Sequence, residues 1–179
     1  LDTMGLTSRI VLDANIYTMN NRAEAFWMKK GILGDTVPLE LNAKELVHRN
    51  NKNSELTVYG YTPMMVSVQC VQKTMDHCNH ACVQYVLKDR YQKEFRGVCS
   101  CEFCYNTIYN TLPTSLLKEK EKAEKLGVKA YRLSFTTETQ QETEKIVRAF
   151  VDVYLRGQKP DGQMQTEETT KGHFQRGVE

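Results

Sequence analysis

The sequence predicts an α/β protein in which parallel strands form half of a (β/α)8 TIM-like barrel with a long cysteine-rich insertion. Short β-rich runs alternate with helical segments along the 179 residues. This alternation favours parallel pairing with right-handed crossovers, and four strand–helix units make half of an eight-stranded barrel. All six cysteines follow the third strand. We expect a half-barrel in residues 1–156, the insertion in residues 62–112 and a C-terminal tail in residues 157–179.

The first two strand–helix units precede the cysteines. The β-rich run Arg9–Tyr17 predicts a strand, and the stretch Arg22–Lys30 predicts the helix that follows it. The run Asp35–Leu41 predicts the second strand. Asn42 can cap the next helix, which we expect over Ala43–Asn50.

The third strand, predicted over Glu55–Gly60, leads into the cysteine window, which we expect to be a long functional loop. After this loop the sequence predicts a charged helix over Pro113–Leu126 and a fourth strand over Ala130–Thr136. Apolar residues at helical spacing between Ile146 and Tyr154 predict a last helix that buries one stripe against the sheet. The polar stretch Gly157–Thr170 has no periodicity and is predicted to be a flexible connection.

Composition restricts the class of protein. The chain has 40% apolar and 26% charged residues, which is typical of a soluble globular protein. No apolar run approaches the roughly 20 residues of a spanning helix, and the N-terminus does not resemble a signal peptide. We therefore expect no membrane partner and a reducing, cytoplasmic location, where clustered cysteines bind metal or do redox chemistry. A net charge of +2 neither implies nor excludes nucleic acid.

Four motifs in order resemble peptidase family U-32, the collagenase-like proteases. They are Glu55-Leu-Thr-Val-Tyr-Gly-Tyr-Thr-Pro-Met-Met65 followed by Cys70, Cys101-x-x-Cys104-Tyr-Asn-Thr-Ile-Tyr-Asn110, Tyr131-Arg-Leu-Ser-Phe-Thr-Thr-Glu138 and Gly172-His-Phe-Gln-Arg-Gly177. The resemblance implies the C-terminal half of a barrel whose N-terminal strands are missing from this sequence. Several relatives are iron–sulfur proteins needed for hydroxylation of tRNA, ribosomal RNA or the ubiquinone ring.

The chain also departs from the better-known family signature. In that signature a His-Gly pair is followed by two cysteines. The first cysteine lies three residues after the glycine, and the second lies ten residues after the same glycine. Here Tyr59 replaces the histidine and Pro63 replaces the first cysteine, whereas Cys70 keeps the second position. The chain therefore looks like a divergent branch, in which the extra cysteines compensate for the lost one.

The cysteine window predicts a metal centre. Cys101 and Cys104 present two thiols at a spacing that suits one metal or cluster. We favour an iron–sulfur cluster of the 4Fe-4S type, and its preferred ligands are Cys70, Cys78, Cys101 and Cys104, with Cys82 and Cys99 as substitutes. The main alternative is structural zinc held by Cys101, Cys104 and two of Cys78, His80 and Cys82.

Three functions compete at this point. Iron–sulfur-dependent hydroxylation of RNA is favoured, because the sequence has neither HExxH nor GxSxG and four thiolates fit a cluster better than a catalytic pair. A peptidase acting on a peptide substrate is the alternative, since His77 and His80 lie near the thiols in sequence. The third is a zinc-stabilised module that binds RNA or protein without catalysis.

Polar residues near strand ends are the other site candidates, because barrel chemistry occurs at the C-terminal ends of strands. Catalytic candidates are Glu40, Tyr59 and Arg132, and substrate-binding candidates are Asn15, Glu138 and His173. Glu40 is either an acid or base or a solvated rim carboxylate. Arg132 needs a carboxylate or phosphate partner, so it clamps a ligand or forms a structural salt bridge. His173 either folds over the barrel mouth or lies on the surface.

One basic segment bears on RNA as a partner. Lys88–Arg96 mixes cations with aromatic residues, as single-stranded RNA binding would use for phosphate contacts and stacking. The alternative is an exposed hairpin in which Asp89 and Glu94 dilute the charge.

Overall fold

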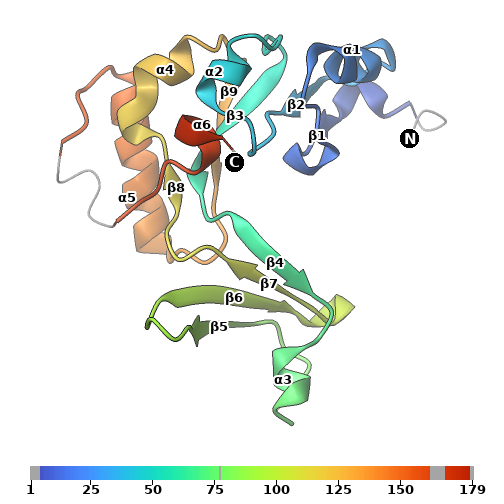
Figure 1. The fold of residues 1–179 in the computed structure, drawn as a ribbon, viewed down its shortest axis with the longest axis vertical. Coiled ribbons are helices and arrows are strands. Elements are labelled where there is room, and N and C mark those ends of the chain that lie inside the picture. Colours follow the sequence, from blue (N-terminus) through green and yellow to red (C-terminus); the bar gives the residue numbers. More distant parts are fainter. Residues whose placement is uncertain (1–4, 77, 162–167, 178–179) are drawn as a thin grey trace.

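The computed structural model describes residues 5–76, 78–161 and 168–177. Two sheets make up the molecule (Figure 1): a five-stranded sheet in the body and a four-stranded antiparallel sheet that projects from it. We call this projection, residues 62–112, the arm. Among the described helices, none is long and apolar enough to cross a membrane.

The body sheet is mainly parallel, which confirms the α/β class. Strands β1 (Val11–Leu12), β2 (Gly34–Thr36), β3 (Ser54–Gly60) and β9 (Ala130–Ser134) pair in that order and run parallel. The short strand β8 (Thr114–Ser115) pairs antiparallel with the end of β3. Within the described residues this sheet stays open and does not close into a barrel.

Helices separate the parallel strands. They are α1 (Asn21–Lys29), α2 (Ala43–Leu46) and α4 (Lys120–Glu124). After the last strand, α5 (Gln140–Phe150) continues as a π-helical turn (Val151–Leu155), and α6 (His173–Arg176) lies in the tail. Short 3-10 turns cover Thr7–Arg9, Ala14–Ile16, Cys101–Phe103 and Leu117–Glu119. Two helix starts have complete capping boxes, Asn42 with Glu45 and Thr139 with Glu142, and the first confirms the predicted cap.

Several predicted elements are shorter than expected, for local reasons. The first strand ends at Leu12 because the Asp13 side chain accepts a hydrogen bond from the backbone N–H of Asn15 and starts a 3-10 turn. The second strand ends before Pro38, which has no N–H for a sheet ladder. Helix α2 ends at Leu46, whose carbonyl accepts from the Asn51 side chain at 2.7 Å.

The segment 113–126 was predicted as one helix, and this prediction is wrong in its first half. Thr114 and Ser115 pair with Gly60 and Tyr59 instead, so the chain leaves the arm as strand β8 before it turns into α4. Of the predicted flexible connection, residues 162–167 lie outside the described residues.

The cysteine window was predicted as a long loop and is instead a sheet. Strands β4 (Pro63–Ser67), β7 (Tyr105–Tyr109), β6 (Glu94–Ser100) and β5 (Val83–Lys88) lie side by side in this order, and α3 (Val71–Thr74) follows β4. The β-branched and aromatic residues of Val83–Lys88 were the available signal for a strand.

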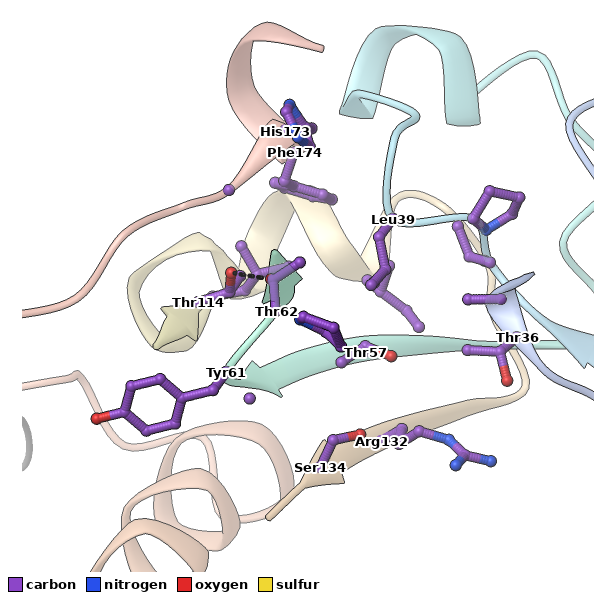
Figure 2. Close-up of a pocket in the computed structure, with 18 of the residues that line it drawn as sticks. Thr36, Leu39, Thr57, Tyr61, Thr62, Thr114, Arg132, Ser134, His173 and Phe174 are labelled. Carbon is purple, nitrogen blue, oxygen red and sulfur yellow. Dashed lines mark hydrogen bonds between the residues drawn. The ribbon is translucent and has the colours of Figure 1, made fainter. Parts of the chain in front are cut away.

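The hydrophobic core lies on one face of the body sheet. Leu56 and Val58 of β3 pack with Phe150 and Val153 of the last helix, and Leu116 closes the same cluster. The opposite face is polar and partly exposed, with Thr57 on β3 and Arg132 and Ser134 on β9 (Figure 2). Parallel sheets are usually covered on both faces, so this polar face is atypical for a parallel sheet.

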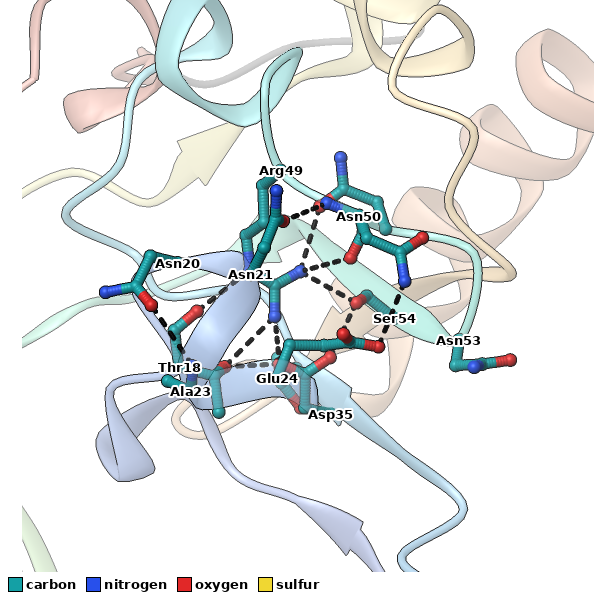
Figure 3. A network of polar contacts seen from close by, with 12 residues as sticks. Thr18, Asn20, Asn21, Ala23, Glu24, Asp35, Arg49, Asn50, Asn53 and Ser54 are labelled. Atoms are coloured by element: carbon teal, nitrogen blue, oxygen red, sulfur yellow. Dashed lines mark hydrogen bonds and ion pairs between the residues drawn. The ribbon is translucent and has the colours of Figure 1, made fainter. Parts of the chain in front are cut away.

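A buried ion pair connects the elements of the body (Figure 3). The guanidinium of Arg49 pairs with the carboxylate of Asp35 on β2, and their side chains are only 2% and 1% exposed. Arg49 Nε donates to the Thr18 carbonyl at 2.8 Å, and one Nη donates to Ser54 Oγ at 2.9 Å. Ser54 Oγ donates to the other carboxylate oxygen of Asp35 at 2.5 Å. The pair is therefore fully hydrogen-bonded, as buried charges require.

We expect Asp35→Ala to lower the free energy of unfolding by about 3–5 kcal/mol, because it leaves the Arg49 charge buried without a partner. The matched control is Glu144→Ala, which removes the acid of an exposed i,i+4 pair with Arg148 and should cost less than about 1 kcal/mol. Urea unfolding followed by circular dichroism measures both. Equal losses in the two variants would contradict a structural role for the buried pair.

Candidate functional site: a thiol cluster and a strand-end pocket

The far end of the arm gathers thiols from three segments. Cys70 caps α3, Cys99 lies in β6, and Cys101 begins the 3-10 turn that follows β6. These three are buried and pack with Val83 and Tyr85. The Sγ atoms of Cys70 and Cys99 are 3.7 Å apart.

The environment shifts the pKa values of these thiols in different directions. Burial, followed by the neighbouring thiol of Cys70, raises the pKa of Cys99 to about 12. The hydrogen bond from the Lys73 backbone lowers the pKa of Cys70. Burial raises the pKa of Cys101, and the Cys78 thiol interacts with it, so Cys78 lies at the edge of the same group. Cys70 therefore carries a thiolate more readily than Cys99 does.

The predicted ligands are brought together in part. The thiols of Cys70, Cys78 and Cys101 lie in one group. Cys99, which was predicted only as a substitute ligand, interacts with both Cys70 and Cys101 and lies at the centre of this group. Cys104 is exposed, and its Sγ lies 3.6 Å from the Cys101 carbonyl oxygen. Cys82 is exposed as well.

The donor atoms of this group are all sulfur. Thiolates favour zinc and iron–sulfur clusters over hard cations, so the chemistry of the donor set fits either predicted cofactor. In the described part of the chain, no three His, Cys, Asp or Glu side chains already form a shell for one metal ion. His77, considered above for a peptidase, lies outside the described residues, and His80 is exposed.

A pocket of about 590 Å³ lies at the C-terminal ends of the parallel strands (Figure 2). Strand ends supply one wall, and α6 in the tail lies across the pocket from β3 and β9. Of the predicted site residues, Asn15, Arg132 and His173 line it. The tail motif therefore reaches the same pocket as the strand ends.

Arg132 has a carboxylate partner within the chain. Its guanidinium forms an ion pair with Glu55 on β3, and Thr36 Oγ1 donates to the same carboxylate at 2.6 Å. The Arg132 side chain is still 42% exposed. Its remaining N–H groups are therefore accessible from the pocket, although the predicted structural salt bridge is present.

Glu138 lies just beyond β9. One carboxylate oxygen accepts from the backbone N–H groups of Thr136 and Thr137, at 2.6 and 3.0 Å. The other oxygen, Oε1, is buried and has no partner among the described residues. Thr136 lines the pocket, so Glu138 stabilises the loop at its edge.

Two of the predicted catalytic residues do not face the pocket. Tyr59 is buried in the core, with its ring 5.5 Å from that of Phe135 and 6.2 Å from that of Phe150. Glu40 lies between two pocket residues, Leu39 and Leu41, and is not among the described residues that line the pocket. Tyr59 faces the core because the bulge between Thr57 and Tyr59 turns its side chain toward the helices.

The basic segment Lys88–Arg96 is an exposed hairpin between β5 and β6, as the second interpretation predicted. Lys88 pairs with Glu94 at 2.9 Å. Arg96 turns toward the body, where its guanidinium lies 4.8 Å from the Tyr61 ring and donates to Thr137 Oγ1 at 3.2 Å. Arg96 thus connects the arm to the body.

Sequence reasoning missed two residues beside the thiols. Asn106 is 1% exposed and lies directly opposite Cys99 across strands β6 and β7. Tyr85 packs against the buried thiols and donates to Asn106. A lone asparagine within the strand-like run Tyr105–Tyr109 was the available signal, because asparagine is depleted in strands.

No family model, curated protein or solved structure matches this chain. The fold and the site therefore define a class only: an α/β protein with a strand-end pocket and a sulfur-rich group on a separate antiparallel arm.

In the reduced, metal-free protein, we expect a soluble alkylating reagent at pH 8 to modify Cys82 and Cys104 first and Cys99 last. Cys99 is buried, and its pKa of about 12 keeps it a protonated thiol at this pH. Peptide mass spectrometry at increasing times measures the order. The control is the same protein in urea, where all six cysteines should react at similar rates. Early modification of Cys99 in the folded protein would contradict its burial.

Proposed function

We propose that this chain is the C-terminal part of a U-32-like α/β barrel enzyme that uses a cysteine-bound iron–sulfur cluster in the hydroxylation of RNA. The gathering of buried thiols at one end of the arm is the observation that carries the proposal. A protein core rarely needs three adjacent thiols for packing alone, whereas a cluster requires them. The proposal includes a cytoplasmic location, where thiols remain reduced.

The body sheet supports the barrel part of the proposal. Its parallel strands pair in chain order, as they do in a (β/α)8 barrel. Glu55 and Arg132 lie on the face that a barrel would enclose, and this face is polar and partly exposed. An N-terminal half-barrel is the proposed partner that covers it.

The described residues indicate how the site would work. Cys70, Cys78, Cys101 and Cys104 would hold the cluster, and Cys99 and Cys82 are the substitutes. When bound, such a cluster supplies one-electron transfer. The pocket and the thiols lie at opposite ends of β4, about 17 Å apart for a strand of five residues. Arg132, Asn15 and His173 would therefore bind the substrate without touching the cluster.

Structural zinc is the second candidate, and one distance favours it. Two thiolates on one tetrahedral zinc lie about 3.8 Å apart, because each Zn–S bond is about 2.3 Å long. The Sγ atoms of Cys70 and Cys99 are 3.7 Å apart. Ligands on different irons of a cluster lie further apart, so occupation by a cluster would require these two thiols to separate or Cys99 to remain unbound.

We expect the anaerobically purified protein to contain iron and sulfide, and Cys70→Ser or Cys101→Ser to lose most of both without unfolding the body. The reason is that a serine oxygen is a poor ligand for iron in such clusters. Iron, sulfide and zinc analysis with visible absorbance measures the result. Tyr91→Phe is the control, since this tyrosine is exposed on the same arm and is not among the proposed ligands. Stoichiometric zinc without sulfide would reject the cluster and support the second candidate.

Hydroxylation makes a distinct prediction in cells. Deletion of the gene should remove the mass of one oxygen from a particular RNA nucleoside, and the purified protein should not cleave gelatin above a chelator-treated control. Returning the intact gene to the deletion strain should restore the modified nucleoside, whereas returning the Arg132→Ala variant should not. Arg132→Lys should restore it poorly, because an ammonium does not reproduce the bidentate fork.

Arg156→Ala, which breaks an exposed ion pair with Asp152, is the matched control and should restore the modification fully. Unchanged RNA together with mutation-sensitive cleavage of gelatin would overturn the hydroxylation proposal in favour of a peptidase.

A further inference from the structure

Side chains from two strands fix the peptide that precedes Cys70. The backbone N–H of Gln69 donates to Ser67 Oγ at 3.1 Å. The carbonyl of Gln69 accepts from Asn106 Nδ2 at 2.8 Å. On the other side of the cysteine, Thr74 Oγ1 donates to the Cys70 carbonyl at 2.9 Å. Cys70 is therefore held in place although it precedes a helix of only one turn.

Asn106 uses both ends of its amide inside the protein. Nδ2 donates to Gln69, and Oδ1 accepts from the hydroxyl of Tyr85 at 3.3 Å. A carbonyl accepts only from a donor, so these partners fix which end of the amide faces Gln69. The result is a chain of hydrogen bonds from Tyr85 through Asn106 to the Gln69 carbonyl, in the peptide bond that precedes Cys70.

The ring of Tyr85 has little room to move. It lies against Gly97, directly opposite on β6, where an added Cβ would come within 2.3 Å of the ring. The same ring packs against the buried thiols, and Asn106 lies opposite Cys99. Tyr85 and Asn106 therefore both lie beside Cys99 as well as supporting Cys70.

We propose that Asn106 and Tyr85 are positioning residues that hold Cys70 in place at the buried end of the arm and so determine how firmly the arm retains its metal group. This inference rests on the proposed function for the metal group and goes further by naming the residues that orient its ligands. Side chains that hydrogen-bond behind metal ligands orient them, and their loss costs about 10–100-fold in affinity. Neither residue is a ligand.

The test uses the complete chain with its metal group and the variants Tyr85→Phe, Asn106→Ala and the double variant. Tyr85→Phe keeps the ring over Gly97 and removes only the hydroxyl. We expect metal release to a chelator to be about tenfold faster in each single variant. The double variant should release metal no faster than Asn106→Ala, because Tyr85 acts through Asn106.

Two further measurements separate positioning from general stability. The visible absorption and reduction potential of the bound group should shift in both single variants and stay unchanged in Tyr91→Phe, an exposed tyrosine on the same arm. Variants that unfold more easily but keep the absorption, potential and release rate of the natural protein would overturn the proposal.

Thiol alkylation gives a readout that does not need the metal group. In reduced, metal-free protein, Asn106→Ala should increase the alkylation rate of Cys70 several-fold and leave Cys82 unchanged. If the natural protein binds no metal, the proposed function fails and this measurement decides the positioning role alone. Equal Cys70 rates in the natural and variant proteins would then overturn it.

Discussion

The buried ion pair between Arg49 and Asp35 is the interaction on which the body depends. Arg49 follows α2, Asp35 lies on β2, and Ser54, which bonds to both, begins β3. Thr18, before α1, contributes its carbonyl. Ser54 lies directly opposite Asp35 and bonds to both members of the pair, so this network ties β2 to β3 in the observed register. The relative positions of the strand ends that line the pocket depend on that register.

Sequence reasoning succeeded where a pattern was local. The stripe of the last helix, the cap at Asn42 and the strand predicted over Glu55–Gly60 each follow from neighbouring residues, and the structure confirms them. It failed where distant partners decide the outcome. Thr114 and Ser115 are extended because the end of β3 is available beside them, and nothing in their own sequence signals this.

The candidate site divides in the same way. Clustering of cysteines identified the thiol group, yet Cys99 was ranked below Cys104 because spacing along the chain does not reveal which strands become neighbours. The pairing of β6 with β7 decides that Cys99 is central. Tyr59 was predicted to be catalytic because it lies near the C-terminal end of a strand. A bulge in β3 instead turns its side chain into the core.

The arm leaves and re-enters the body at nearly one point. The backbone N–H of Asn110 donates to the Thr62 carbonyl at 2.9 Å, so the two ends of this excursion are adjacent. Closing such a gap with a short turn would cost the body little chain entropy. The junction between β3 and β8 is therefore a position where a segment of different length or chemistry could replace the arm without altering the parallel sheet.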